Sequence, residues 1–199
     1  ELPKAETIVL WGANVNDLYP PYTRWLKAAH DGGTKIIYVD PRRTRTSLWC
    51  DSQLRLQPGT DGILALGAIR YILEKGAYSE ERARFQIEDF ENLAPQTEKF
   101  TLEYVESITR LSREQIVAFY DALAASNKTI VWLGGSLSRQ TNGITTARTI
   151  ILLQALRDNL IGEGKGMLTF QSGKPGGGEE LVDHYFGENK TPKMNFRRL

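Results

Sequence analysis

Residues 36–61, IIYVDPRRTRTSLWCDSQLRLQPGTD, constrain the fold more than any other part of this sequence. The apolar run 36–39 ends at the carboxylate of Asp40, and a Pro-Arg-Arg turn follows. The segment 53–56 then alternates in polarity and stops at a Pro-Gly-Thr turn that leads to Asp61. Two strand ends, each closed by a turn with an acidic residue, predict a nucleotide held beyond the carboxyl ends of parallel strands, where ligands bind in open α/β sheets.

Strand and helix patterns alternate along most of the chain. Helical spacing of apolar residues and the positions of Pro and Gly separate the two kinds of element. A further three or four helices are expected between residues 79 and 126, one of them opened by a Ser112-x-x-Gln115 capping box. Strands are predicted at residues 6–10, 35–39, 53–56 and 129–133, and the main helices at 22–30, 60–76 and 141–161.

This alternation predicts that residues 1–162 form one dinucleotide-binding α/β domain. It would have three layers: a mostly parallel sheet of Rossmann-like strand–helix–strand units, with helices on both faces. Beyond Gly162 the sequence becomes rich in glycine and then polar. Residues 163–199 are therefore predicted to be a Gly-rich loop and a polar tail. Because the sequence does not begin with Met, we expect it to be part of a longer parent chain.

Composition excludes several classes of protein. A net charge of +1 gives no field that would attract nucleic acid, and no apolar run approaches the ~20 residues of a membrane span. A single cysteine, Cys50, rules out an iron–sulfur cluster held by this chain alone. Neither histidine has metal-ligand spacing, and nucleophile and phosphate-loop motifs are missing, so we predict no catalytic and no metal-binding residue. The sequence therefore favours a chain that binds a ligand over one that catalyses a reaction by itself.

The residues after the predicted strands suit a nucleotide. Gly12 and Gly135 would let phosphates approach the backbone, and Arg42 could form charge-assisted bonds to them. Asp40 could accept from ribose hydroxyls. Asp61 could accept from guanine N1–H and N2–H, two adjacent donors that adenine lacks.

Each of these residues also has a purely structural interpretation. Asp40 before proline could simply form a turn, and Asp61 could be a first-turn acid favoured by the helix dipole. Trp11 could be a core residue, and Arg42 a solvated surface charge. Their joint placement at strand ends favours the binding site.

Several blocks in order resemble the dimethyl sulfoxide reductase family of molybdopterin oxidoreductases. They are WGAN, GTKIIYVDPRRTRT, CDSQLRLQPGTDGILALGAIRYILEKGAYSEE, TIVWLGGSLSRQTNG and LRDNLIGEGKG, and the resemblance as a whole runs from about residue 6 to residue 178. The resemblance implies the α/β domain that binds one of two molybdopterin guanine dinucleotides. It departs from the family pattern at Cys50, where alanine is common, and at residues 157–160, where a Thr-Gly-Asn type of turn is usual; the second departure is expected to alter how a late loop approaches the cofactor.

The resemblance also implies roles for individual residues. One group would line the pyrophosphate, a second would meet the guanosine ribose and phosphates, a third would read guanine, and a glycine after the fourth strand would face the pterin. In that order they are Trp11, Gly12 and Asn14; Asp40, Pro41 and Arg42; Gly59 and Asp61; and Gly135.

For the parent enzyme, the resemblance implies two-electron redox chemistry with oxygen-atom transfer at a cofactor that carries two molybdopterin guanine dinucleotides. Its partners would be the remaining domains of the same catalytic subunit and an iron–sulfur electron-transfer subunit. An iron–sulfur cluster is compatible with that parent but not with this chain. The substrate, the choice between molybdenum and tungsten, and a bacterial or archaeal cytoplasm or periplasm stay open.

Two alternatives remain at this stage. A stand-alone domain could bind a nucleotide or assist cofactor assembly without catalysing a reaction. An unrelated α/β protein could bind NAD or ADP, although Gly12 has no G-x-G-x-x-G around it, which disfavours this alternative.

Overall fold

The computed structural model describes residues 1–169, which are built around a five-stranded sheet. The strand order is β3-β2-β1-β4-β5, and every pairing is parallel. This is the order of doubly wound α/β sheets, in which the chain direction across the sheet reverses between the first and fourth strands. The strands are β1 (Thr7–Trp11), β2 (Lys35–Val39), β3 (Ser52–Leu54), β4 (Thr129–Leu133) and β5 (Gly166–Thr169).

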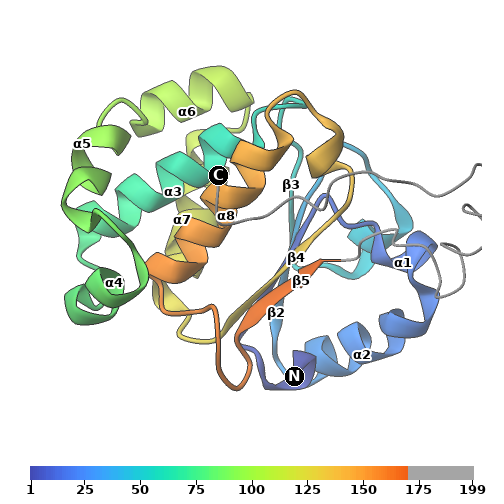
Figure 1. The fold of residues 1–199 in the computed structure, drawn as a ribbon. Helices are drawn as coiled ribbons and strands as arrows, with labels where there is room; N and C mark the ends of the chain where they lie inside the picture. The colour runs from blue at the N-terminus through green and yellow to red at the C-terminus, as the bar shows by residue number, and fades with distance from the viewer. Residues whose placement is uncertain (170–199) are drawn as a thin grey trace, which may run out of the picture. The chain divides into compact units, whose positions relative to one another are not determined.

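Helices cover both faces of the sheet, so the predicted three-layer α/β class is confirmed (Figure 1). On one face, α1 and α2 pack against side chains such as Trp132, whose ring lies 5.8 Å from that of Tyr19. On the other face, α3, α7 and α8 form the larger core with residues such as Val9 and Val131. The central strands are buried throughout, which explains their continuous apolar sequences.

The helices begin and end largely where the sequence signals lie. Ser112 opens α7 with the predicted capping box, and Gly76 closes α3 in the left-handed conformation (φ 62°). The α-helices are α1 (Val15–Leu18), α2 (Pro20–Asp31), α3 (Asp61–Lys75), α4 (Glu80–Gln86), α5 (Leu93–Thr97), α6 (Leu102–Thr109), α7 (Arg113–Ala125) and α8 (Gly143–Leu156). Short 3₁₀ turns are η1 (Leu2–Lys4), η2 (Arg45–Trp49), η3 (Phe90–Asn92) and η4 (Leu137–Arg139).

The expectation of loop beyond Gly162 is wrong for residues 166–169, which form the edge strand β5 beside β4. The buried side chain of Gln154 helps to hold this strand, because its amide nitrogen donates to the carbonyl oxygens of Thr129 and Gly166. Helix α8 is also shorter than predicted and ends at Leu156. The predicted tail from residue 170 onward lies outside the described residues.

Candidate functional site

The loops after β1 and β4 touch each other at the reversal point of the sheet. Gly12 adopts a φ of 62°, and its N–H donates to the Val39 carbonyl at 2.7 Å. The N–H of Gly134 donates to the Trp11 carbonyl at 2.8 Å. A Cβ atom on Gly134 would lie 1.8 Å from the carbonyl oxygen of Gly12, so the two backbones leave no room for any side chain there.

The rest of the loop after β4 and the loop after β3 lie at the same edge of the sheet. The Ser136 hydroxyl donates to the Gly12 carbonyl at 3.1 Å, and Gly135 beside it is exposed. Gly59, with a φ of 86°, is exposed in the loop after β3, where its nearest neighbour across the site is the side-chain oxygen of Gln140. We call the loops after the carboxyl ends of the strands, residues 12–14, 40–43, 57–61 and 134–140, the rim.

Asp40 and Arg42 form one unit of the rim. The Asp40 side chain is buried, with 3% of its surface exposed, and its carboxylate accepts the Arg42 backbone N–H at 2.8 Å. The Arg42 guanidinium lies 3.4 Å from the same oxygen but is 63% exposed, so it remains accessible to a ligand. The Asp40 carboxylate raises the pKa of Arg42, which therefore stays a cation.

The backbone of this turn is held from β3. Gln53 donates its amide to the carbonyl oxygens of Asp40 and Arg42, and Arg55 donates to the Pro41 carbonyl at 3.3 Å. Pro41 therefore shapes the turn and offers no polar side chain to a ligand. The alternating sequence of residues 53–56 thus has a function beyond pairing, because its polar side chains fix the acidic turn.

Asp61 is a buried carboxylate at the first turn of α3. It is 6% exposed, and one oxygen accepts the indole N–H of Trp11 at 2.9 Å. Burial raises the pKa of Asp61, the Trp11 hydrogen bond opposes that rise, and the nearby charge of Asp40 adds to it. The two carboxylates are therefore close enough to interact, and the rim brings them together from two different strand ends.

Trp11 itself is a core residue. Its side chain is fully buried, and its ring packs edge-to-face on Phe119 with the centroids 5.8 Å apart. The Trp11 indole thus points into the core and meets Asp61, and the role of this position beside a pyrophosphate stays a prediction. The sequence alone does not predict this hydrogen bond, because Asp61 lies 50 residues further along the chain than Trp11.

Asn14 lies at the start of α1 and is also buried. Its side-chain oxygen accepts the Thr46 hydroxyl at 2.8 Å, and its amide donates to Asp17 at 2.9 Å. Thr46 is fully buried in η2 and also accepts the Asn16 N–H at 3.0 Å. Thr46 thus ties the loop after β1 to the segment after β2. Sequence reasoning missed it, because a lone threonine among polar residues carries no pattern.

The unusual turn at residues 157–159 lies at the opposite end of the sheet. The Asn159 side chain accepts the backbone N–H of Thr129, the first residue of β4. Arg157 donates to the carbonyl oxygens of Ala77, Leu123 and Ser126, just at and beyond the ends of α3 and α7. Within the described residues these side chains bond to backbone groups of neighbouring elements, and the expected effect on how a late loop approaches the cofactor stays a prediction.

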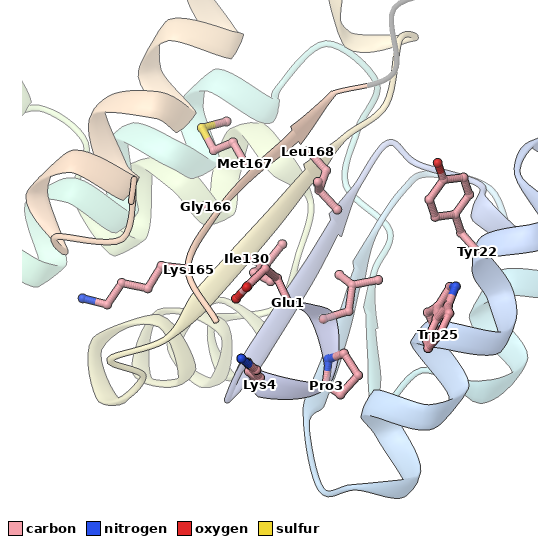
Figure 2. Close-up of a pocket in the computed structure, with 11 residues that line it drawn as sticks. Glu1, Pro3, Lys4, Tyr22, Trp25, Ile130, Lys165, Gly166, Met167 and Leu168 are labelled. Atoms are coloured by element: carbon pink, nitrogen blue, oxygen red, sulfur yellow. The ribbon is translucent and has the colours of Figure 1, made fainter. Parts of the chain in front are cut away.

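The larger cavities lie away from the rim. One of about 580 Å³ is bounded by η1, by Tyr22 and Trp25 of α2 and by the start of β5, and none of the predicted cofactor-binding residues lines it (Figure 2). Among residues 1–169, no group of three or more His, Cys, Asp or Glu side chains is arranged to hold a metal ion. None of the helices described is long and apolar enough to cross a membrane.

The fold and the rim define an α/β domain whose polar and glycine residues gather at the carboxyl ends of a doubly wound sheet. The sequence model of the family described as molybdopterin oxidoreductase matches residues 1–193. The chain therefore belongs to the molybdopterin oxidoreductase family, and the resemblance to the dimethyl sulfoxide reductase family is confirmed.

Relatives within this family carry different activities. The chain is 27% identical to the F420-dependent formate dehydrogenase subunit alpha of Methanocaldococcus jannaschii, covering 84% of this chain and 25% of that protein. It is 27% identical to the assimilatory nitrate reductase catalytic subunit of Bacillus subtilis, covering 90% and 26%. Acetylene hydratase from Pelobacter acetylenicus superimposes with a TM-score of 0.76 at 26% identity, covering 81% and 22%. The chain thus spans about a quarter of the length of these relatives.

Proposed function

We propose that this chain is the cofactor-binding domain of a molybdopterin oxidoreductase and that its rim holds the guanine dinucleotide end of the cofactor. The observation that carries this proposal is the convergence of Asp40 and Asp61, two buried carboxylates from separate strand ends, on one rim. Each carboxylate has protein partners but keeps lone pairs that those partners do not use, and burying such groups is unfavourable; two that also repel one another point to a ligand that supplies hydrogen-bond donors.

The other residues of the rim fit the phosphate part of such a ligand. Gly12 is half-buried at the reversal point of the sheet, where anions approach most closely in doubly wound folds, and Gly134 packs directly against it. Arg42 adds an exposed cation beside Asp40. Ribose hydroxyls can donate to Asp40 while the guanidinium meets a phosphate. Gly59 and Gly135, both exposed, would border the same ligand.

Asp61 would read the base. A carboxylate has about four lone-pair positions, and Trp11 occupies one of them, so Asp61 retains the capacity to accept two further donors. Guanine presents N1–H and N2–H side by side, whereas adenine presents a donor next to an acceptor. This chemistry favours guanine over adenine at the rim.

In the parent enzyme this domain would grip and orient the cofactor. When bound, the molybdenum–pterin group would supply the two-electron redox and oxygen-atom transfer chemistry. The residues described here would hold its nucleotide end: Asp61 the base, Asp40 the ribose and Arg42 the phosphates, with Gly12 leaving space for their close approach. The remaining domains of the catalytic subunit and an iron–sulfur electron-transfer subunit would be the partners.

Titration of the 199-residue chain with GDP and with ADP by calorimetry tests this proposal. GDP should bind more tightly than ADP. Asp61→Asn should lower GDP affinity by about tenfold or more, the scale of one to two hydrogen bonds to a charged group, and change ADP affinity little. Asparagine keeps an acceptor for the Trp11 indole, so the local packing is retained. An equal loss for both nucleotides would remove the guanine-reading role.

A further inference from the structure

We propose that Trp11 is a positioning residue for guanine recognition: its buried indole N–H fixes the Asp61 carboxylate in the orientation that meets the base. This inference rests on the proposed function and deepens it. In addition to the loop that follows β1, the last side chain of the strand itself would then contribute to the choice of base.

The indole is held rigidly by its surroundings. Trp11 ends the central strand β1, pairs in register with Val39 and Leu133 on either side, and is fully buried. Its ring lies against Phe119 of α7 at an interplanar angle of 76°. The direction of the N–H is thus set by the sheet and by α7 together, before any ligand binds.

Asp61 is the only acceptor that this N–H has among the described residues, and Trp11 is the only other residue there whose side chain donates to Asp61. Indole nitrogen is a donor only, and a buried donor without an acceptor is unfavourable. The pair therefore constrains both partners. A carboxylate with one oxygen anchored cannot rotate freely, so its remaining lone pairs present a fixed pattern toward the rim.

The indole also helps to keep Asp61 ionised. Burial and the negative charge of Asp40 both raise the pKa of Asp61, and the Trp11 hydrogen bond acts against them. Asp40 is the charged group that acts on Asp61 from the neighbouring loop, and it is itself bonded to the Arg42 side chain. A protonated Asp61 would accept poorly from two adjacent N–H donors. Loss of the indole N–H should thus raise the pH at which guanine binding fails.

Trp11→Phe tests the proposal in the 199-residue chain, because phenylalanine keeps an aromatic ring against Phe119 and removes the donor. We expect GDP affinity at neutral pH to fall by about tenfold, the scale of one hydrogen bond to a charged group, with little change for ADP. In both proteins GDP affinity should fall as the pH is lowered, and in the variant the midpoint should lie at higher pH.

Trp132→Phe is the matched control. Trp132 is equally buried, lies on the neighbouring strand β4, and faces α2 with its ring 5.6 Å from that of Tyr22. It shares the cost of shrinking a core aromatic, but its ring lies on the opposite face of the sheet from that of Trp11. Its GDP-to-ADP affinity ratio and its pH midpoint should match the wild type.

A second measurement does not depend on the folding of Trp11→Phe. The chain has four tryptophans, and the Trp11 indole resonance of the ¹⁵N-labelled wild-type chain can be assigned by elimination with Trp25→Phe, Trp49→Phe and Trp132→Phe. It should shift with pH as Asp61 titrates and shift again on addition of GDP. If wild type prefers GDP but Trp11→Phe keeps the ratio and midpoint, or if the indole resonance responds to neither pH nor GDP, positioning by Trp11 is refuted and the proposed function stands. If wild type shows no preference for GDP, the proposed function itself fails.

Discussion

Gly134→Ala is the sharpest test of how the rim is built. The added Cβ would lie 1.8 Å from the Gly12 carbonyl oxygen and 2.3 Å from its carbonyl carbon. Ordinary contact would require the loops after β1 and β4 to separate by roughly 1.5 Å. Both loops are tied to central strands, since the N–H of Gly134 bonds to the Trp11 carbonyl and the N–H of Gly12 bonds to Val39. The clash is thus between two backbones, and neither can yield by a change of rotamer.

The expected loss of stability follows from that geometry. Overpacking typically costs about 1–3 kcal/mol, and a backbone clash of this size belongs at the upper end, about 3 kcal/mol. For a chain of this length each kcal/mol corresponds to about 2–4 °C, so the melting temperature should fall by about 6–12 °C. Thermal unfolding followed by circular dichroism measures this change. Because the shift distorts the rim, GDP affinity should fall as well.

Gly62→Ala is a suitable control. Gly62 lies in the first turn of α3, and its added Cβ would meet the hydroxyl oxygen of Thr146 at 3.1 Å, a side-chain atom that can move by a few tenths of an ångström. Alanine also favours a helix over glycine by about 1 kcal/mol. Its melting temperature should stay within about 3 °C of the wild type, about 1 kcal/mol. The interpretation of the rim is wrong if Gly134→Ala unfolds like this control and binds GDP normally.

Two further predictions concern groups outside the rim. Arg157→Met should lower the free energy of unfolding, measured by urea titration, by about 2–4 kcal/mol, because it removes the donors to the carbonyl oxygens of Ala77, Leu123 and Ser126. A loss below about 0.5 kcal/mol would show that water replaces the guanidinium at no cost. Cys50 should be inert toward a thiol reagent at pH 8 in the folded chain and reactive in urea. Burial raises the pKa of its thiol to about 12, and its Sγ–H donates to the Thr46 carbonyl. Rapid labelling of the folded chain would contradict this prediction.

The sequence was sufficient to predict the fold where burial on both faces produced continuous apolar runs. Residues 35–39 and 129–133 are such runs, and both are strands with the predicted bounds. The edge strand β5 escaped prediction for a physical reason. Its four residues are only partly buried and begin at a glycine, so neither length nor apolarity distinguishes them from the Gly-rich loop in which they lie.

The rim shows the same division between local and distant information. The acidic turn at Asp40 and the helix start at Asp61 are local signals, and both residues lie where the chain pattern placed them. The contacts that organise them are not local. Trp11 reaches Asp61 across 50 residues, and the hydroxyl of Thr46 reaches Asn14 across 32. Such pairs depend on the register of the sheet, which no short motif encodes.

The two ends of the sheet carry different kinds of polar contact, and this difference bears on function. At the amino ends, side-chain groups of Gln154, Asn159 and Arg157 form hydrogen bonds with backbone atoms of neighbouring elements, which stabilises the fold. At the carboxyl ends, Asp40 and Asp61 are buried carboxylates whose charges interact; Arg42 and Tyr38 lie beside the first, and the Trp11 indole bonds to the second. Buried carboxylates that interact unfavourably raise the energy of the unliganded protein at the carboxyl ends, and this is expected where a bound ligand supplies further donors. The guanine end of the cofactor has donors of the required kind, and this is why the rim rather than the larger cavity beside β5 is the better candidate for the site.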